Sequence, residues 1–243
     1  MPSAFVVPAR HSLRSHYMVE RFGRRIPEPT VVRLPLYQRV LRDLALGAVA
    51  TVSSAELASA CGVNAAKLRK DLSYFGTYGT RGTGYDVGYL LGQIERELGL
   101  DRERCVVMAG MGHLGHALAR SPGFMSGGFR VVGLFDVAPS VLGEIVAGTG
   151  VAHISTLPDV CRQTGASMGV ITTPASAAQD VCDQMVASGV NAILNFAPSV
   201  LVAPPSVHVR HVDFSAELQV LAFYQAHPEP AEAASDLGAG LIL

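Results

Sequence analysis

The chain has 243 residues, of which 49% are hydrophobic and 16% charged, so it is long enough for two domains and too apolar to be disordered throughout. No apolar run reaches the roughly eighteen residues that a membrane span requires, and the arginine-containing N-terminal segment is unlike a signal peptide. The four cysteines are scattered and none forms a CxxC pair, which excludes a secreted disulfide scaffold and gives a structural zinc site no support. We therefore expect a cytoplasmic protein without a membrane segment or a bound metal.

The net charge of −1 conceals an uneven distribution of charge along the chain. Residues 1–85 contain 12 Lys and Arg against 5 Asp and Glu, whereas residues 86–243 contain 7 against 15. A basic front and an acidic back indicate a polyanion-binding module joined to a module with a different ligand.

The front of the chain begins without clear periodicity, and we expect residues 1–29 to form a basic, flexible arm. Helical spacing of apolar residues then predicts a helix from Leu34 to a stop at Gly47, with Pro35 in its first turn. We expect the domain that contains this helix to span residues 30–85.

Two further helices are predicted in the front module. Ser53 and Glu56 match a capping box that opens the first of them. A tight turn follows at Gly62, after which Asn64 can cap a third helix that runs to about Phe75.

Four glycines, Gly76, Gly79, Gly82 and Gly84, alternate with Thr and Tyr after the third helix. This pattern predicts a small β-hairpin, because the residues between the glycines are strand formers. Three helices followed by a hairpin describe a winged helix-turn-helix.

The third helix has one face for a core and another for a polyanion. Leu68, Leu72 and Phe75 recur at helical spacing, whereas Lys67 and Lys70, which are the only lysines of the chain, fall on a different face. A solvated charged face is the alternative, but the helix order and the basic charge favour DNA. We expect DNA contacts from Ser54, Asn64, Lys67, Arg69, Lys70, Tyr74, Arg81 and Gly82.

The back of the chain alternates strands with helices from Cys105 onward, which indicates a buried parallel sheet. Asp86 can cap a helix through Leu98 that connects the two modules. Strands are predicted at Cys105–Ala109, Val131–Phe135, Met168–Ile171, Ala192–Leu194 and His208–Val212, and helices at Leu114–Arg120, Leu157–Gln163, Ala175–Ser188 and Ser215–Tyr224. We expect residues 86–212 to form a Rossmann-type domain, 213–226 a C-terminal helix and 227–243 a disordered tail.

A GxGxxG motif, Gly110-Met111-Gly112-His113-Leu114-Gly115, follows the first of these strands and opens a helix. Asp136 ends the next strand at the spacing of a dinucleotide fingerprint. Its carboxylate is suited to a ribose hydroxyl and would repel a 2′-phosphate, so NAD+ or NADH is favoured over the phosphorylated dinucleotides. Further contacts are expected from loops at the ends of other strands, at Thr173, Pro174, Asn195 and Phe196.

No catalytic residue is predicted. A dehydrogenase needs a proton donor beside the hydride position, and no lysine follows Lys70 while the histidines form no recognisable catalytic pattern. We therefore expect the back module to hold a dinucleotide without consuming it, and the protein not to be an enzyme.

From about Ile26 to Tyr224 the chain resembles the Rex family of redox-sensing transcriptional repressors. The resemblance rests on Arg33-Leu34-Pro35-Leu36-Tyr37, Leu68-Arg69-Lys70-Asp71-Leu72-Ser73-Tyr74-Phe75-Gly76, Tyr78-Gly79-Thr80-Arg81-Gly82, Gly84-Tyr85, the GxGxxG, Pro122-Gly123-Phe124, Phe135-Asp136, Asn195-Phe196-Ala197-Pro198 and Val212-Asp213. It implies a homodimer that binds operator double-stranded DNA with NAD+ and releases it with NADH. It also implies that the C-terminal helix is exchanged between subunits.

The chain departs from the family at Ser121, where Rex proteins commonly have a tyrosine. In the family that tyrosine is thought to trade partners between an arginine and an aspartate, whose positions here are Arg39 and Asp213. Because a serine hydroxyl has a shorter reach, we expect Arg39 and Asp213 to pair directly or through water in one state of the dimer.

Two other functions remain open from the sequence. One is an NAD-dependent oxidoreductase with a nucleic-acid-binding appendage. The other is a regulator that binds coenzyme A, since the back module also resembles Rossmann domains that bind this nucleotide.

Overall fold

A computed structural model describes residues 19–21, 24–80, 83–123 and 127–228. They form two compact units that divide between Leu98 and Gly99. No helix of the described residues is long and apolar enough to cross a membrane. Within the same residues, no three His, Cys, Asp or Glu side chains are grouped as metal ligands.

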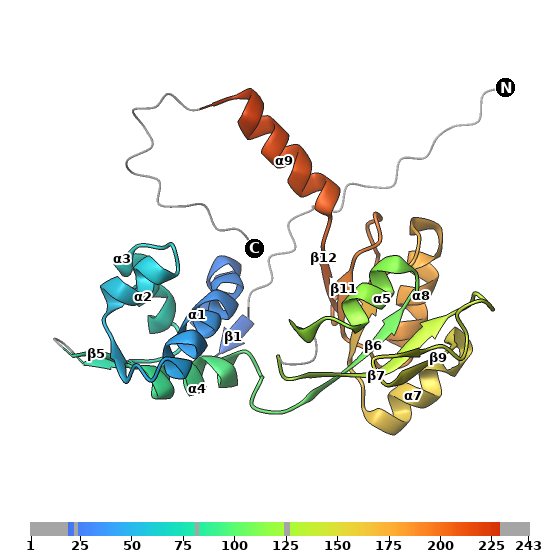
Figure 1. Ribbon diagram of the computed structural model, residues 1–243, viewed down its shortest axis with the longest axis horizontal. Coiled ribbons are helices and arrows are strands. Elements are labelled where there is room, and N and C mark those ends of the chain that lie inside the picture. Colours follow the sequence, from blue (N-terminus) through green and yellow to red (C-terminus); the bar gives the residue numbers. More distant parts are fainter. Residues whose placement is uncertain (1–18, 22–23, 81–82, 124–126, 229–243) are drawn as a thin grey trace. The chain divides into compact units, whose positions relative to one another are not determined.

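The first unit is a winged helix (Figure 1). A ribbon of β1 (Val19–Arg21) and β2 (Arg24–Ile26) leads into three helices, α1 (Glu28–Leu46), α2 (Ser54–Ala60) and α3 (Ala65–Ser73). The wing is an antiparallel sheet of β3 (Thr51–Val52), β5 (Gly84–Asp86) and β4 (Gly79–Thr80), and α4 (Val87–Glu97) follows it. Strand β3 was not predicted.

The caps predicted for this unit are present. The Ser53 side chain accepts a hydrogen bond from the Glu56 N–H while Glu56 reaches back to the Ser53 N–H, which completes the capping box of α2. Asp86 caps α4 by accepting the Tyr89 N–H at 2.7 Å. Local sequence therefore sets where these two helices start.

The predicted start of α1 was wrong by six residues. The helix begins at Glu28 with Pro29 in its first turn, and Pro35 lies in the helix interior on an exposed position. An interior proline removes one helical hydrogen bond, but burial of Leu34 and Leu41 in the core of the unit outweighs that loss. Of the arm expected at residues 1–29, residues 1–18, 22 and 23 lie outside the described residues, whereas residues 19–21 and 24–26 are strands and residues 28–29 begin α1.

The boundary predicted after Tyr85 was also misplaced. Helix α4 buries Val87, Leu90 and Ile94 in the same core as α1 and α3, so it belongs to the first unit. The reason is that its apolar face is needed to close the winged-helix core.

The second unit has a seven-stranded sheet in the order β12-β11-β10-β6-β7-β9-β8. Its strands are β6 (Arg104–Ala109), β7 (Phe129–Asp136), β8 (Ile145–Val146), β9 (Thr149–His153), β10 (Met168–Ile171), β11 (Ala192–Asn195) and β12 (His208–His211), and only β8 is antiparallel to its neighbour. The hairpin of β8 and β9 was not predicted.

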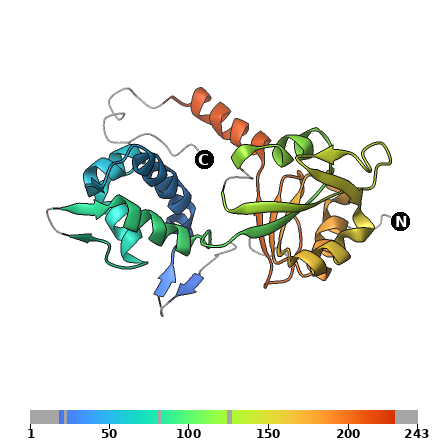
Figure 2. The same ribbon diagram turned by 60° about the horizontal axis from the view of Figure 1, so that its bottom comes forward.

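Helices cover the two faces of this sheet unequally (Figure 2). On one face α7 (Leu157–Thr164) and α8 (Ala175–Ala187) bury the largest cluster of apolar side chains, and η1 (Ile154–Thr156) precedes α7. On the other face α5 (His113–Ala119) covers Val106 and Met108 of β6. The chain reverses direction across the sheet between β6 and β10, which is where α/β sheets bind ligands.

The last described helix is α9 (Phe214–Ala226), and none of its residues is buried. Its apolar side chains, Phe214, Leu218, Val220, Leu221, Phe223 and Tyr224, are between 46% and 66% exposed. Most of the tail expected at residues 227–243 lies outside the described residues, which end at Pro228.

Candidate functional site

Helix α3 is anchored at its start and along one face. The Asn64 side-chain oxygen accepts the Lys67 N–H at 2.7 Å and caps the helix, while Leu68 and Leu72 are buried. Asn64 therefore keeps its two amide N–H groups and one acceptor position on its oxygen for DNA, because the cap uses a single lone pair. Phe75, expected in the core, is half-buried.

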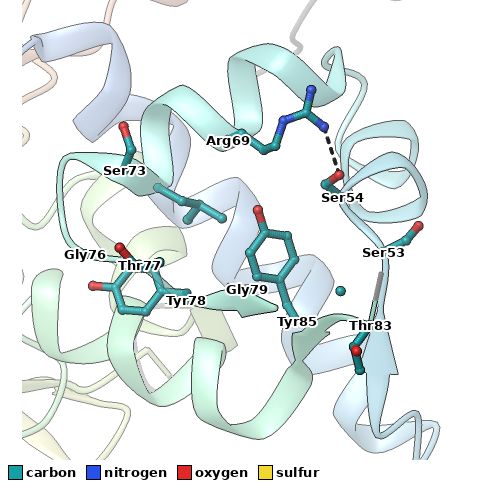
Figure 3. Close-up of a pocket in the computed structure, with 12 residues that line it drawn as sticks. Ser53, Ser54, Arg69, Ser73, Gly76, Thr77, Tyr78, Gly79, Thr83 and Tyr85 are labelled. Atoms are coloured by element: carbon teal, nitrogen blue, oxygen red, sulfur yellow. Dashed lines mark hydrogen bonds between the residues drawn. The ribbon is translucent and has the colours of Figure 1, made fainter. Parts of the chain in front are cut away.

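The exposed surface of α3 carries two sets of cations. Lys67 and Lys70 are exposed and Tyr74 beside them is half-buried. Arg69 points to the other flank, where its guanidinium donates to the Ser54 hydroxyl of α2 at 3.1 Å (Figure 3). Of the eight predicted DNA-contact residues, Lys67, Arg69 and Lys70 lie on α3, Asn64 and Tyr74 cap its two ends, and Ser54 lies on α2 within hydrogen-bond distance of Arg69. The other two, Arg81 and Gly82, fall outside the described residues.

A hollow of about 520 Å³ lies between α2, α3 and the wing (Figure 3). It is lined by Ser53, Ser54, Arg69, Leu72, Ser73, Gly76, Thr77, Tyr78, Gly79, Thr83, Gly84 and Tyr85. At Gly84, with a φ of +88°, a Cβ atom would overlap the Val52 carbonyl oxygen, so only glycine lets β5 pass this close to β3. Sequence reasoning missed the hollow, although the two tyrosines of the glycine-rich segment are part of its wall.

The glycine-rich loop of the second unit has the geometry of a phosphate-binding turn. Gly110 has a φ of +99° and lies against the backbone of Thr172, whereas a Cβ at Gly112 would meet no atom within 4 Å. A Cβ at Gly115 would overlap the Gly110 carbonyl oxygen, so glycine there lets α5 pack closely on the loop. The three glycines therefore provide the turn, the open approach and the close packing that a pyrophosphate needs.

Asp136 ends β7 beside this loop. One carboxylate oxygen accepts the Met111 N–H at 2.6 Å, and the other accepts the N–H groups of Val137 and Ala138 at 2.7 and 2.8 Å. A carboxylate has about four acceptor positions, so one remains for a ribose hydroxyl. The same side chain thus fixes the loop and can hold a ligand.

A cavity of about 550 Å³ joins the loop to the ends of neighbouring strands. It is lined by the predicted residues Gly110, Gly112, Asp136, Thr173, Pro174 and Phe196, together with Ala109, Phe135, Val137, Ile154, Thr172, Ala177, Val181 and Pro198. The Thr173 hydroxyl is buried, and no hydrogen-bond partner for it exists among the described residues. An orphaned hydroxyl on a cavity wall points to a ligand that supplies the missing bond.

Two of the predicted cofactor-binding residues, Met111 and Asn195, have buried side chains. The Met111 side chain is 1% exposed and packs in the core beside α5, so only its backbone reaches the loop. The Asn195 side chain is fully buried, accepts the Ala197 N–H and donates to the Ser199 carbonyl and His211. Its amide therefore shapes the cavity wall.

Three other residues of the glycine-rich motif lie off the lining of the cavity. His113 is exposed, Leu114 is half-buried and Gly115 is buried under the loop. On the next turn His116 bridges the Gly112 carbonyl at 2.9 Å and the Glu144 carboxylate at 3.0 Å, and these bonds raise the pKa of its imidazole.

The cavity wall also contacts the base of α9. The rings of Phe196 and Phe214 are 6.0 Å apart, and the Asn195 carbonyl accepts the Val212 N–H at 2.9 Å. A change at Phe196 is thereby adjacent to the first residue of the C-terminal helix.

Of the three predicted switch residues, Asp213 caps α9 by accepting the Ser215 and Ala216 N–H groups at 2.9 and 3.2 Å. Both bonds use the same carboxylate oxygen, which leaves the other for a cation. Arg39 is exposed on α1, and Ser121 is half-buried just after α5. The pairing of Arg39 with Asp213 stays a prediction, because the two residues belong to different units.

Comparison with known proteins assigns both units to one family. Residues 25–73 match the family described as "Putative DNA-binding protein N-terminus", and residues 101–199 match "CoA binding domain". The redox-sensing transcriptional repressor Rex of Streptomyces coelicolor is 56% identical to this chain, and the match covers 92% of this chain and 86% of the relative. The Rex repressor of Syntrophomonas wolfei is 46% identical, and the match covers 83% of this chain and 96% of the relative.

Solved structures give the same assignment. One of them is RSP, a Rex-family repressor that is 32% identical to this chain. The structure of RSP bound to NAD+ and operator DNA matches with a TM-score of 0.79, and the match covers 87% of this chain and 97% of RSP. Its complex with NADH matches with a TM-score of 0.75, covering 84% and 95%. This chain therefore belongs to the Rex family of redox-sensing transcriptional repressors.

Proposed function

We propose that this protein is a cytoplasmic, homodimeric repressor that binds operator DNA with NAD+ and releases it when NADH binds. The observation that carries the proposal is the presence in one chain of a winged helix with an exposed basic face and of a Rossmann cavity with a dinucleotide fingerprint. The RSP structures support it, since that relative was solved with NAD+ and operator DNA and with NADH.

The residues of the cavity fit a dinucleotide. Gly112 leaves room for the pyrophosphate, Asp136 has a free acceptor position for the adenosine ribose, and Thr173 has a buried hydroxyl without a partner in the described chain. We assign Gly110, Pro174 and Phe196 to the walls that orient the bound molecule.

Hydride transfer to a substrate has no support in this cavity. Among the described residues that line it, Asp136 is the one acidic or basic side chain, and its carboxylate accepts hydrogen bonds from three backbone N–H groups. A bound dinucleotide would therefore meet no general acid there. The match to a CoA-binding family is explained by the shared Rossmann fold, and competition between coenzyme A and NADH would reveal any second ligand.

The homodimer is supported by α9. Six large apolar or aromatic side chains of one helix are about half-exposed or more, a patch that a soluble monomer rarely presents. A second copy that covers this helix would bury them, in line with the helix exchange that the family resemblance implies.

Linkage sets the size of the redox response. NADH can weaken operator binding only by the factor by which it binds more tightly to the dimer arrangement that does not bind DNA. A gel shift with a palindromic operator tests this, with NAD+ and NADH titrated separately. The complex should persist with NAD+ and dissociate with NADH. Equal behaviour with both nucleotides would contradict the proposal.

A further inference from the structure

A tyrosine side chain forms part of the wall of the hollow between α2, α3 and the wing. Tyr85 is only 7% exposed, with its ring in the core of the winged helix, yet its hydroxyl has no hydrogen-bond partner among the described residues. Figure 3 shows this hydroxyl directed into the hollow, toward the side of α3 that carries Arg69. Because this hydroxyl opens on the hollow, a water molecule or an oxygen atom of a ligand can pair with it there.

The groups around that hydroxyl are hydrogen-bond donors. Arg69 uses one N–H on the Ser54 oxygen and keeps the others, while the Ser54 hydroxyl hydrogen has no partner in the described chain. None of the described residues that line the hollow is acidic. Burial raises the pKa of Tyr85, so its hydroxyl stays a neutral donor. One cation and two hydroxyl donors that converge in this way fit an anion.

We infer that the hollow formed by Ser54, Arg69 and Tyr85 binds one phosphate of the operator backbone. This inference rests on the proposed function, and it separates Arg69 from the lysines of α3. Lys67 and Lys70 lie on the surface of α3 that would face base edges. Arg69 and Tyr85 would instead bind the sugar-phosphate backbone of the DNA strand beside that surface. Arginine, serine and tyrosine are among the usual phosphate partners in protein–DNA complexes.

The test uses the full-length protein and duplex operators that carry a single methylphosphonate, which removes the charge of one phosphate at a time. Tyr85→Phe should weaken binding of the unmodified operator about tenfold, with no change in salt dependence because the lost group is neutral. Arg69→Gln should also weaken it and lower the salt slope by about 0.9 per site. At one methylphosphonate position, Tyr85→Phe should cause no additional loss.

Controls separate a local effect from misfolding. Tyr89→Phe removes the hydroxyl of an exposed tyrosine on α4 that is not part of the hollow, and it should leave operator affinity unchanged. Tyr85→Phe should keep the wild-type melting temperature and NADH affinity. If that variant does not fold, Ser54→Ala takes its place and should show the same loss at the same phosphate.

Two outcomes overturn the inference. One is wild-type operator affinity in Tyr85→Phe. The other is that Tyr85→Phe weakens binding equally for every methylphosphonate operator, which is the result expected if the hollow held a free anion and not a phosphate of the operator. A wild-type protein that fails to bind the operator would instead contradict the proposed function itself.

Discussion

Arg33 on α1 and Asp71 on α3 form a bidentate ion pair that joins the first helix of the DNA-binding unit to its recognition helix. The Arg33 Nε and Nη2 atoms donate to the two Asp71 oxygens at 2.6 and 2.7 Å, and Thr30 and Tyr37 donate to the same carboxylate at 3.0 and 2.7 Å. Asp71 is 2% exposed and the Arg33 side chain 11%. The orientation of α3 thus depends on a buried charge with four hydrogen bonds.

Asp71→Asn should destabilise the winged helix by about 3–5 kcal/mol, because it leaves the buried Arg33 without a counter-charge. The measurement is urea unfolding at pH 7, followed by circular dichroism. Glu95→Gln is the matched control. It breaks the more exposed pair with Arg42, whose side chains are 29% and 41% exposed, and should cost no more than about 1 kcal/mol. Equal losses of unfolding free energy for the two substitutions would show that the buried Arg33–Asp71 pair stabilises the fold no more than the exposed Arg42–Glu95 pair does.

The same pair makes the stability of this unit depend on acid. Burial alone would raise the pKa of Asp71, but the hydrogen bonds from Arg33, Tyr37 and Thr30 outweigh it and hold that pKa below its usual value. A carboxyl with a lowered pKa stabilises the fold above its unfolded pKa of about 4, and that contribution is lost as the pH falls through the folded pKa. The difference in unfolding free energy between wild type and Asp71→Asn should therefore shrink at acidic pH.

Replacing Lys67 and Lys70 together with alanine should weaken operator binding, and its salt slope should fall by about 0.9 for each of the two lysines that contacts a phosphate in addition to base edges. Affinity for NADH should not change, because the lysines and the cavity belong to different units. Fluorescence anisotropy over a range of salt concentrations measures both the operator affinity and its salt slope. Arg96→Ala, which removes an exposed cation of α4, is the control. An unchanged affinity in the double variant would remove α3 from DNA recognition.

Asp136→Ala should weaken NADH binding by about 1–3 kcal/mol, since it removes an acceptor for the ribose and frees the Met111 N–H of the loop. Operator binding without cofactor should survive. A fluorescence titration of NADH gives the affinity, and a wild-type value would mean that Asp136 does not hold the ribose.

Asp213→Asn should reduce the difference in operator affinity between NAD+ and NADH while both cofactors still bind. Asparagine also caps helices, so the start of α9 is retained and only the negative charge that the predicted pairing with Arg39 requires is lost. Arg39→Gln should have the same effect, and the two substitutions together should add little more. A double variant whose losses sum would show that the two residues act independently.

Much of this architecture was predictable because it rests on local chemistry. The capping box of Ser53 and Glu56, the Asn64 cap and the glycine motif from Gly110 to Gly115 each specify a turn and the helix that follows it. The family assignment and both modules were confirmed.

The failures have a shared cause in long-range packing. Pro35 was interpreted as a first-turn proline, which left Thr30 and Arg33 off the helix and hid their contacts with Asp71, 41 and 38 residues away. Asn195 was assigned to the cofactor because it follows a strand, whereas its amide is engaged by the loop that it begins. The edge strand β8 has two residues, which are too few to show a period, and the hairpin that it forms with β9 was missed with it.

The central claim is that one protein couples the two sites, and its most direct test is operator affinity at saturating NAD+ and at saturating NADH. Coupling between sites is typically worth about 1–3 kcal/mol, so we predict that NADH weakens operator binding about 5- to 150-fold relative to NAD+. By linkage, the operator should change the preference for NADH over NAD+ by the same factor. Operator affinities that agree within error for the two nucleotides, with both shown to be bound, would contradict the account.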